Sequence, residues 1–262
     1  MFKGEDIFRK LPLARLVAVA LLILSGSALA STTDSLMSTG NAAYQSKDFP
    51  RAIAAYQELT SLGYEGTSLY YNLGNSYYRA GKIGLAILYY EKASRLSPGD
   101  EDVAHNLAIA NARTVDKLDA LPRFFVFQWW ESLLALFSLS GWTHVVFTLY
   151  IISLFAFGLY FLARQRFIQR NSFFVGLVAT LLLILSISIG AVKLNRELTV
   201  RDAIVIEPTA VVKLAPDPTS NDAFVVHEGL KVRELDEVEN WVKIRLQDGK
   251  LGWIQKDEIA TI

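Results

Sequence analysis

The sequence predicts a multidomain membrane protein that combines an all-α repeat array, a two-helix transmembrane hairpin and a small all-β barrel. Three observations predict this order. Residues 31–120 carry a pattern that recurs after 34 residues, two long uncharged apolar runs follow it, and residues 198–262 break into short strand-like segments. A chain of 262 residues is long enough for two small domains beside a hairpin.

Residues 1–30 have the pattern of a signal peptide. Four basic residues come first: Lys3, Arg9, Lys10 and Arg15. The apolar run 16–24 is too short to span a membrane, and small residues follow it, with Ala28 and Ala30 at the positions that favour cleavage after Ala30. The alternative is an uncleaved anchor. Both interpretations deliver residue 31 onward to the outside.

Residues 31–120 contain two copies of one pattern, at about 33–66 and 67–100. Residues of the first copy return 34 positions later: Gly40-Asn41 as Gly74-Asn75, Tyr44 as Tyr78, Ala52-Ile53 as Ala86-Ile87, and Tyr56 as Tyr90. Small residues are needed where two helices cross, and large ones fill the remaining space. Residues 101–119 are expected to form a closing helix, because Asp100 is a suitable N-cap.

These repeats resemble the tetratricopeptide repeat family. The second copy matches its signature positions: Tyr70, Leu73-Gly74, Tyr77, Ala86, Tyr90, Ala93 and Pro98. The first copy departs from it at Ala43 and Leu59. The resemblance implies a concave protein-binding groove lined by Asn41, Tyr44, Tyr71, Asn75, Tyr78, Arg79 and Arg113.

Some members of that family clamp a carboxylate with paired asparagines and lysines. Asn41 and Asn75 match the asparagines, but Met37 and Asp102 stand where basic residues would be needed, so the clamp is incomplete. An array with a purely structural role is the alternative to a binding groove.

Residues 121–142 form an aromatic segment that includes Trp129-Trp130 and ends at Trp142. Aromatic side chains at this density before an apolar run suit the headgroup region of a bilayer. We therefore expect a short helix in the outer interface. The alternative is a helix packed under the repeat array.

The two apolar runs are residues 143–163 and 173–192, and neither contains Asp, Glu, Lys or Arg. Each is long enough to cross the hydrocarbon core as a helix. The loop 164–172 between them carries three arginines: Arg164, Arg166 and Arg170. Short arginine-rich loops stay in the cytoplasm, so both flanking domains are expected outside. The alternative is a pair of buried helices in a soluble protein.

The hairpin is interpreted as an anchor, because no ionisable residue lies at depth in either run and transport normally requires such groups. Ser186 and Gly190 are spaced to let the two helices approach closely.

Residues 198–262 contain six short strand-like runs separated by turn signals such as Glu228-Gly229 and Asp248-Gly249. The runs are 203–206, 211–214, 224–226, 231–235, 241–246 and 251–254. This region resembles bacterial SH3-like domains, most specifically in the segment from Asp248-Gly249 to Gly252-Trp253. The resemblance implies binding of peptides or cell-wall stem peptides. Trp241 and Trp253 are the candidate ligand-binding residues, although barrel core is the favoured interpretation for at least one of them.

The order of segments along the whole chain resembles the BatE-like proteins of the bacterial aerotolerance operon group. The similarity rests on the two repeats, Asn106-Leu107-Ala108, the Trp129-Trp130 segment, the hairpin and the SH3-like region. It implies membrane-anchored von Willebrand A-domain partners, a MoxR-type ATPase, and a role in aerotolerance or envelope stress.

The leading functional hypothesis is a non-catalytic scaffold in a bacterial inner membrane that binds protein partners on its periplasmic face. The alternative is a cell-wall-associated module whose SH3-like domain binds peptidoglycan peptides. An enzyme is disfavoured, because the three histidines, His105, His144 and His227, are scattered and no phosphate-binding loop or nucleophile motif is present. We expect no cofactor, no metal and, with zero net charge, no nucleic-acid partner. The absence of cysteine excludes disulfides and thiol catalysis.

Overall fold

The computed structural model describes residues 33–117 and 124–262, so the expected signal peptide lies outside the described residues. The chain divides into two units, residues 1–65 and 66–262, which we describe separately. The second unit contains the second repeat, the apolar helices and the β-sheet.

The first unit consists of a helix at residues 33–45 and of α2 (Phe49–Ser61). Asp48 caps α2, because its carboxylate accepts a hydrogen bond from the backbone N–H of Arg51, and Pro50 occupies the first turn without needing a donor. A Cβ on Gly40 would lie 2.4 Å from Cε1 of the buried Tyr56. Only glycine fits this helix crossing, as the repeat pattern predicts.

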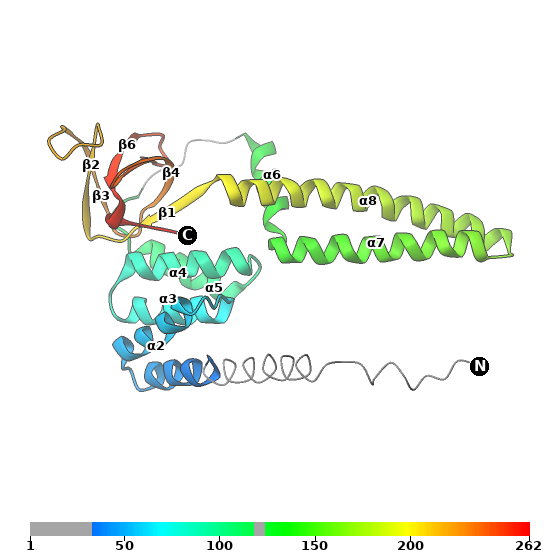
Figure 1. Ribbon diagram of the computed structural model, residues 1–262, viewed down its shortest axis with the longest axis horizontal. Helices are drawn as coiled ribbons and strands as arrows, with labels where there is room; N and C mark the ends of the chain where they lie inside the picture. The colour runs from blue at the N-terminus through cyan, green and yellow to red at the C-terminus, as the bar shows by residue number, and fades with distance from the viewer. Residues whose placement is uncertain (1–32, 118–123) are drawn as a thin grey trace, which may run out of the picture. The chain divides into compact units, whose positions relative to one another are not determined.

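The second unit begins with three helices: α3 (Thr67–Arg79), α4 (Ile83–Leu96) and α5 (Glu101–Ala112). They pack on one another, and Figure 1 shows them as a compact group. Gly74 repeats the close crossing, because a Cβ there would lie 2.6 Å from Cδ1 of Tyr90. Asp100 caps α5 by accepting from the backbone N–H groups of Asp102 and Val103. The helix ends at Ala112, earlier than the expected 119, and the chain then turns toward the sheet.

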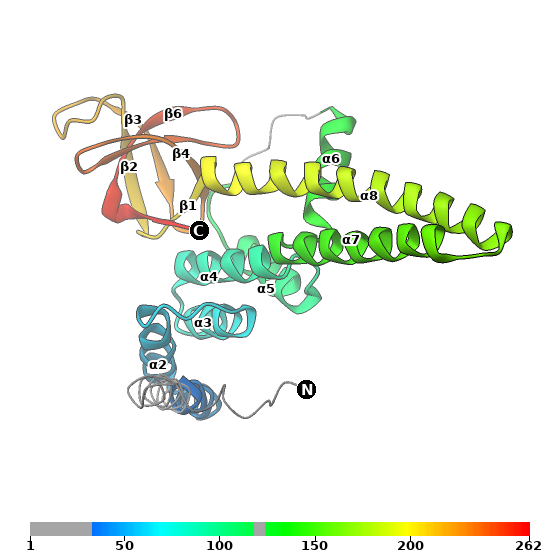
Figure 2. The same ribbon diagram turned by 45° about the vertical axis from the view of Figure 1, so that its right-hand side comes forward.

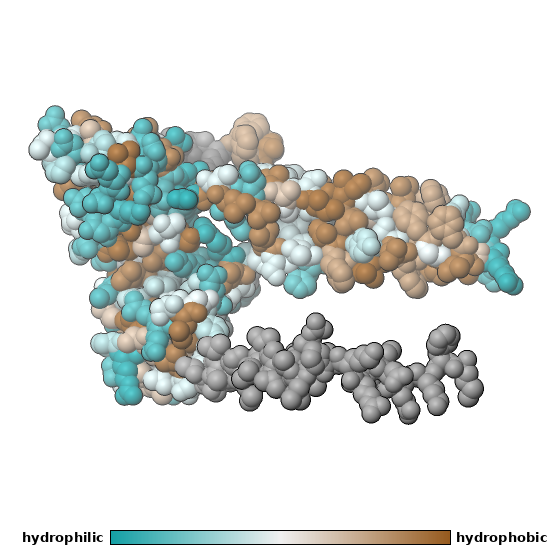
Figure 3. All heavy atoms as spheres, viewed as in Figure 1, coloured by the Kyte–Doolittle hydropathy of each residue, from teal (hydrophilic) through white to brown (hydrophobic). Residues whose placement is uncertain are grey.

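Two long apolar helices follow, α7 (Leu139–Leu162) and α8 (Arg166–Thr199). At 1.5 Å per residue they are about 36 and 51 Å long, so each exceeds the hydrocarbon thickness of a bilayer. Arg166 and Arg170 lie in the first turns of α8, and only residues 163–165 connect the two helices. Figure 3 shows this hairpin as mainly hydrophobic on its surface, with a hydrophilic tip.

The helices of the hairpin meet along small residues. Ser153 and Ala156 of α7, and Ser172, Gly176, Ala179 and Ser186 of α8, are buried. The hydroxyl groups of Ser153 and Thr180 lie 2.7 Å apart across the seam. Small residues and interhelical hydrogen bonds are the features that pair helices in an apolar solvent.

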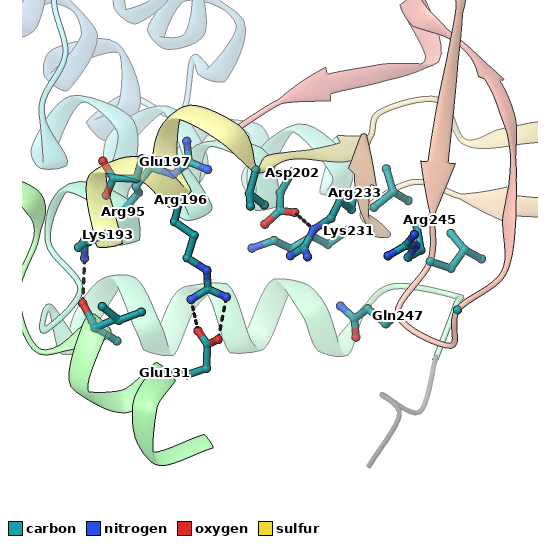
Figure 4. A pocket seen from close by; sticks show the side chains of 16 residues that line it. Arg95, Glu131, Lys193, Arg196, Glu197, Asp202, Lys231, Arg233, Arg245 and Gln247 are labelled. Carbon is teal, nitrogen blue, oxygen red and sulfur yellow. Dashed lines mark hydrogen bonds and ion pairs between the residues drawn. The ribbon is translucent and has the colours of Figure 1, made fainter. Parts of the chain in front are cut away.

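The aromatic segment forms α6 (Phe125–Ala135), which packs against the end of the hairpin through a cluster of Leu134, Trp142 and Ile189. The Lys193 ammonium of α8 donates to the carbonyl oxygens of Leu134 and Phe137, at 3.0 and 2.6 Å. Arg196 holds Glu131 of α6 with two hydrogen bonds of 2.6 and 2.7 Å (Figure 4). The segment is thus fixed to the hairpin rather than hanging as a linker.

The C-terminal region is one seven-stranded antiparallel sheet in the order β3-β2-β6-β5-β4-β1-β7. The strands are β1 (Arg201–Val205), β2 (Thr209–Lys213), β3 (Asp222–His227), β4 (Lys231–Val238), β5 (Trp241–Arg245), β6 (Leu251–Gln255) and β7 (Ile259–Thr261), with the 3₁₀ turn η2 (Lys256–Glu258) before β7. Its core holds Val205, Val212, Val232, Ile244 and Ile254.

The six strand runs expected from the sequence correspond to β1–β6, whereas β7 was not expected. Three residues after a 3₁₀ turn give no alternation long enough to indicate a strand. The expected closed barrel is not confirmed, because β3 and β7 end the sheet and pair with β2 and β1 only. Gly252 is needed inside β6, since a Cβ there would lie 2.4 Å from Cγ1 of Val212.

The sheet is continuous with the hairpin. Val200 alone separates the end of α8 from the start of β1, so the sheet follows the helix without a flexible linker (Figure 2). On its other side β1 packs against α4 of the second repeat. One strand therefore joins the repeat helices to the apolar hairpin.

Candidate partner-binding site

An asparagine and a tyrosine link the two helices of each repeat. The Tyr56 hydroxyl donates to Oδ1 of Asn41 at 2.7 Å, and the Tyr90 hydroxyl donates to Oδ1 of Asn75 at 2.7 Å. The 34-residue period thus reproduces a hydrogen bond as well as a packing pattern. Both asparagines have a structural task, which explains their recurrence without any ligand.

In the second repeat the asparagine belongs to a larger network between α3 and α5. The side-chain amide of Asn106 donates to Oδ1 of Asn75 and to the hydroxyl oxygen of Tyr71, at 2.9 Å each. Two donors therefore occupy the carbonyl oxygen of Asn75. Its amide nitrogen makes no hydrogen bond to a described residue, so this atom can donate to a carboxylate or a peptide carbonyl.

A cationic edge borders this network. The guanidinium of Arg113, which follows α5, stacks 4.9 Å from the ring centroid of Tyr78, and the side chain of Arg113 is exposed. Arg79 is exposed at the end of α3. Planar guanidinium groups on aromatic supports recognise carboxylates well, because little side-chain freedom is lost on binding.

Tyr77 and Tyr89 form a stacked pair between α3 and α4, with ring centroids 5.5 Å apart. Burial raises the pKa of the Tyr77 hydroxyl, with a smaller contribution from Tyr89, and burial also raises the pKa of Tyr89. Both hydroxyls therefore stay neutral at physiological pH. The pair stabilises the α3–α4 packing on which the candidate surface depends.

The structure brings together four of the seven groove residues expected from the sequence. Tyr71, Asn75, Tyr78 and Arg113 surround the contact between α3 and α5. Asn41 and Tyr44 belong to the first unit, where the Tyr44 ring contacts Phe49 edge-on at 5.6 Å. A groove that includes both units stays a prediction.

Trp241 and Trp253, the candidate ligand residues of the sheet, lie on the neighbouring strands β5 and β6. Side chains alternate along β5, so Val242 and Ile244 enter the core cluster and Lys243 lies on the other face. Trp253 is opposite Lys243 in the register, and the Lys243 ammonium lies 5.8 Å from its ring. Trp241 is buried, as expected for at least one of the two tryptophans, whereas Trp253 is half-buried.

An interface between the second repeat and the sheet was not expected from the sequence. The Glu228-Gly229 turn between β3 and β4 reaches the start of α4, where the Glu228 carboxylate accepts from the backbone N–H of Gly84 at 2.9 Å. A Cβ on Gly84 would lie 2.8 Å from the carbonyl oxygen of Val205. The close approach thus requires glycine at this position.

Charged contacts flank that interface. Asp116, after α5, accepts from the backbone N–H of His227 at 2.7 Å and lies 3.0 Å from its Nδ1. Glu91 of α4 forms an ion pair of 2.8 Å with Lys231 of β4. The sequence indicates this surface only by one difference between the two repeats. Gly84 of the second copy occupies the position that Pro50 holds in the first.

No group of three or more histidine, aspartate or glutamate side chains that could hold a metal occurs within residues 33–117 and 124–262. The contacts of the second repeat use asparagine, tyrosine and arginine side chains.

A family model described as tetratricopeptide repeat matches residues 37–101. This match covers both repeats and supports a helical array of the kind that generally mediates protein–protein interaction without catalysis. No curated protein matches the chain.

Proposed function

We propose that this protein is a non-catalytic membrane scaffold that holds protein partners on its repeat surface. The α7–α8 hairpin anchors the chain, and the repeats and the sheet both lie on the periplasmic side of a bacterial inner membrane. The partners are other membrane-anchored envelope proteins, of the von Willebrand A-domain kind that the BatE-like resemblance implies. The setting is an aerotolerance or envelope-stress complex.

The observation that carries the anchoring is the exposure of the hairpin. Only 11% of the most apolar window of α7 and 22% of that of α8 are buried within the protein. Large apolar side chains such as Phe155, Phe161 and Leu181 are more than half exposed. A core helix of a soluble protein would bury this surface, whereas lipid covers it without cost.

The arginines at the hairpin tip support the orientation. Arg164, Arg166 and Arg170 gather there with no acidic residue between them, whereas Lys193 and Arg196 at the other end are engaged by α6. Under the positive-inside rule the tip is cytoplasmic. Protease added to spheroplasts should then cut the sheet, and full protection of residues 198–262 would overturn the orientation.

In vivo crosslinking tests the scaffold. A photoreactive residue placed at Arg79 should yield discrete adducts in intact membranes, and Arg113→Glu should reduce them because the cationic edge is reversed. Arg51→Glu is the matched control, since Arg51 is equally exposed but belongs to α2. Equal adducts in Arg113→Glu and Arg51→Glu would contradict partner binding at this surface.

A second function, binding of cell-wall peptides, is favoured by the outward face of β5 and β6. Lys243 lies over Trp253, and this combination suits the carboxylates and apolar stems of peptidoglycan peptides. Detergent-solubilised full chain should then sediment with purified sacculi and lose this behaviour on Trp253→Ala. Unchanged sedimentation of that variant would exclude this face.

A further inference from the structure

A basic cavity of about 740 Å³ lies where the hairpin, α6, the repeat helices and the sheet meet. Figure 4 shows side chains from α8, β1, β4 and β5 around one hollow, with Glu131 of α6 on its far side. Cavities of this size hold small ligands. Neither the Asn75–Tyr78–Arg113 surface of the second repeat nor Trp241 or Trp253 contributes to it.

The lining carries an excess of positive charge. Six basic side chains face three acidic ones, Glu131, Glu197 and Asp202. The six are Arg95, Lys193, Arg196, Lys231, Arg233 and Arg245. Opposing carboxylates account for three of these cations: Glu131 binds Arg196, Glu91 binds Lys231 and Asp202 binds Arg233.

The remaining three cations have no bonded aspartate or glutamate side chain. Arg95 donates to an oxygen of Ile262, the last residue of the sequence, at 2.7 Å, and Lys193 donates to the backbone carbonyls of Leu134 and Phe137. Arg245 makes no ion pair or hydrogen bond with a described residue through its side chain. Glu197, one turn after Lys193, offsets one charge, so the side chains leave an excess of about two positive charges, which suits a phosphate group.

The position of the cavity along α8 identifies the source of that phosphate. The uncharged run ends at Val192, so Lys193 and Arg196 lie about 1.5 and 6 Å beyond it along the helix. The headgroup layer on each side of the hydrocarbon core is roughly 5–7 Å thick. If the hairpin spans a bilayer, these two side chains are at the depth of lipid phosphates.

The walls of the cavity are mixed, as a lipid headgroup site requires. Leu134 and Ala135 of α6 line the side toward the hairpin, and Arg233, Arg245 and Gln247 line the side toward the sheet. Exposed aromatic side chains of α6, including Phe127 and Trp129, come shortly before the lining residue Glu131 in the sequence. Aromatic rings prefer the same interfacial layer.

We infer that this cavity binds the phosphate of an anionic phospholipid headgroup and that the bound lipid fastens the sheet to the end of the hairpin. Arg95 and Arg245 supply donors from the repeat and the sheet, while Lys193 supplies one from the hairpin. The inference rests on the membrane anchoring proposed above, but not on any protein partner.

Native mass spectrometry of the full chain in a neutral detergent tests this inference. Titration with phosphatidylglycerol should show one retained lipid, and phosphatidylcholine should be retained less. Arg245→Gln should weaken phosphatidylglycerol binding about 10-fold, as expected for one charge-assisted hydrogen bond. Arg245→Lys should retain most of the affinity.

Lys213→Gln is the matched control. Lys213 is a basic residue of the same sheet, on β2, but does not line the cavity, so its loss should leave lipid affinity unchanged. Equal weakening by Lys213→Gln and Arg245→Gln would overturn the inference, as would equal retention of the two lipids. Circular dichroism identifies variants that fail to fold, and Arg95→Gln then provides a second site to test.

Inorganic phosphate in large excess distinguishes the two sources of phosphate. A lipid site should keep its phosphatidylglycerol, whereas displacement by inorganic phosphate would overturn the lipid assignment in favour of a soluble ligand. Alkaline extraction of membranes reports on anchoring separately, and the crosslinks at Arg79 report on the scaffold. Failure of the lipid site is thus distinguishable from failure of the proposed function.

Discussion

The two repeats share a core but differ at the start of their second helices. Each places a glycine against a buried tyrosine, and each bonds that tyrosine to an asparagine. In the first repeat Asp48 caps α2 from within the repeat. In the second, Lys82 occupies the N-cap position without a side-chain bond, and Glu228 of the sheet binds the N–H of Gly84 instead.

This difference explains why the second repeat can bind the sheet at this helix start. Pro50 in the first copy has no N–H to offer, while Gly84 in the second offers an N–H and also leaves room for the carbonyl of Val205. A carboxylate at a helix N-terminus is stabilised by the helix dipole. The second repeat therefore depends on the sheet for a cap that the first supplies itself.

The largest expected effect comes from making the second repeat like the first. Gly84→Pro removes the donor to Glu228 and fills the space beside Val205, so docking should weaken by about 3–5 kcal/mol. The chain has no cysteine, so Glu91→Cys and Lys231→Cys form a clean pair for a bifunctional maleimide. Crosslinking of this pair should fall sharply.

Pro50→Gly in the first repeat is the control for that experiment. It should leave the 91–231 crosslink unchanged, since α2 belongs to the other unit. A normal crosslink yield in Gly84→Pro would show that the docked arrangement does not need the cap from the sheet.

The shared core predicts a matched pair of losses. Gly40→Ala and Gly74→Ala each place a methyl group against a buried ring, so each should lower the unfolding free energy by about 1–3 kcal/mol. Urea denaturation of the full chain followed by circular dichroism measures both. If Gly40→Ala leaves the unfolding free energy unchanged while Gly74→Ala lowers it, the two cores are not equivalent.

Substitution of the asparagine in each repeat should have a smaller effect on the unfolding free energy, and the two effects should differ. Asn75→Ala removes the oxygen that accepts from both the Tyr90 hydroxyl and the Asn106 amide. It should therefore lower the unfolding free energy by about 1–2 kcal/mol more than the loss of a single hydrogen bond does. Asn106→Ala combined with Asn75→Ala should be less than additive in a double-mutant cycle. Full additivity would mean that the network is not coupled.

The smallest effect is the cap itself. Glu228→Ala should cost about 1 kcal/mol in the melting of the full chain, as loss of a helix cap usually does. Lys82→Asp should restore part of this loss, because it supplies the cap that Asp48 provides in the first repeat. No rescue would indicate that Glu228 acts mainly through contacts of the sheet.

Local patterns predicted much of this molecule. The period of 34 residues predicted the glycine–tyrosine crossings that the structure contains, and Asp100 predicted the start of α5. Six strand runs were visible because side chains of β5, such as Val242 and Ile244, alternate with charged residues. These features depend on residues close together in the sequence, so they can be predicted before the fold is known.

The candidate site was only partly predictable. Repeat spacing placed Asn75 and Tyr78 on one surface, yet it gave no indication that Asn106 would bind the carbonyl oxygen of Asn75. The closed barrel was expected from the succession of short strands and is not confirmed, because β3 and β7 end the sheet. The expected core position of at least one tryptophan agrees with the burial of Trp241. Alternation alone does not reveal which strands end a sheet.

The sequence by itself determined the repeat period, the apolar hairpin and the short strands, because each follows from residue type and local spacing. Only the tertiary structure decided that Glu228 caps α4, that Asp116 holds His227, and that six cations surround one cavity. Glu228 and Gly84, and likewise Asp116 and His227, are at least 111 residues apart in the sequence. Contacts at such separations depend on how helices and strands pack in space, which no local pattern records.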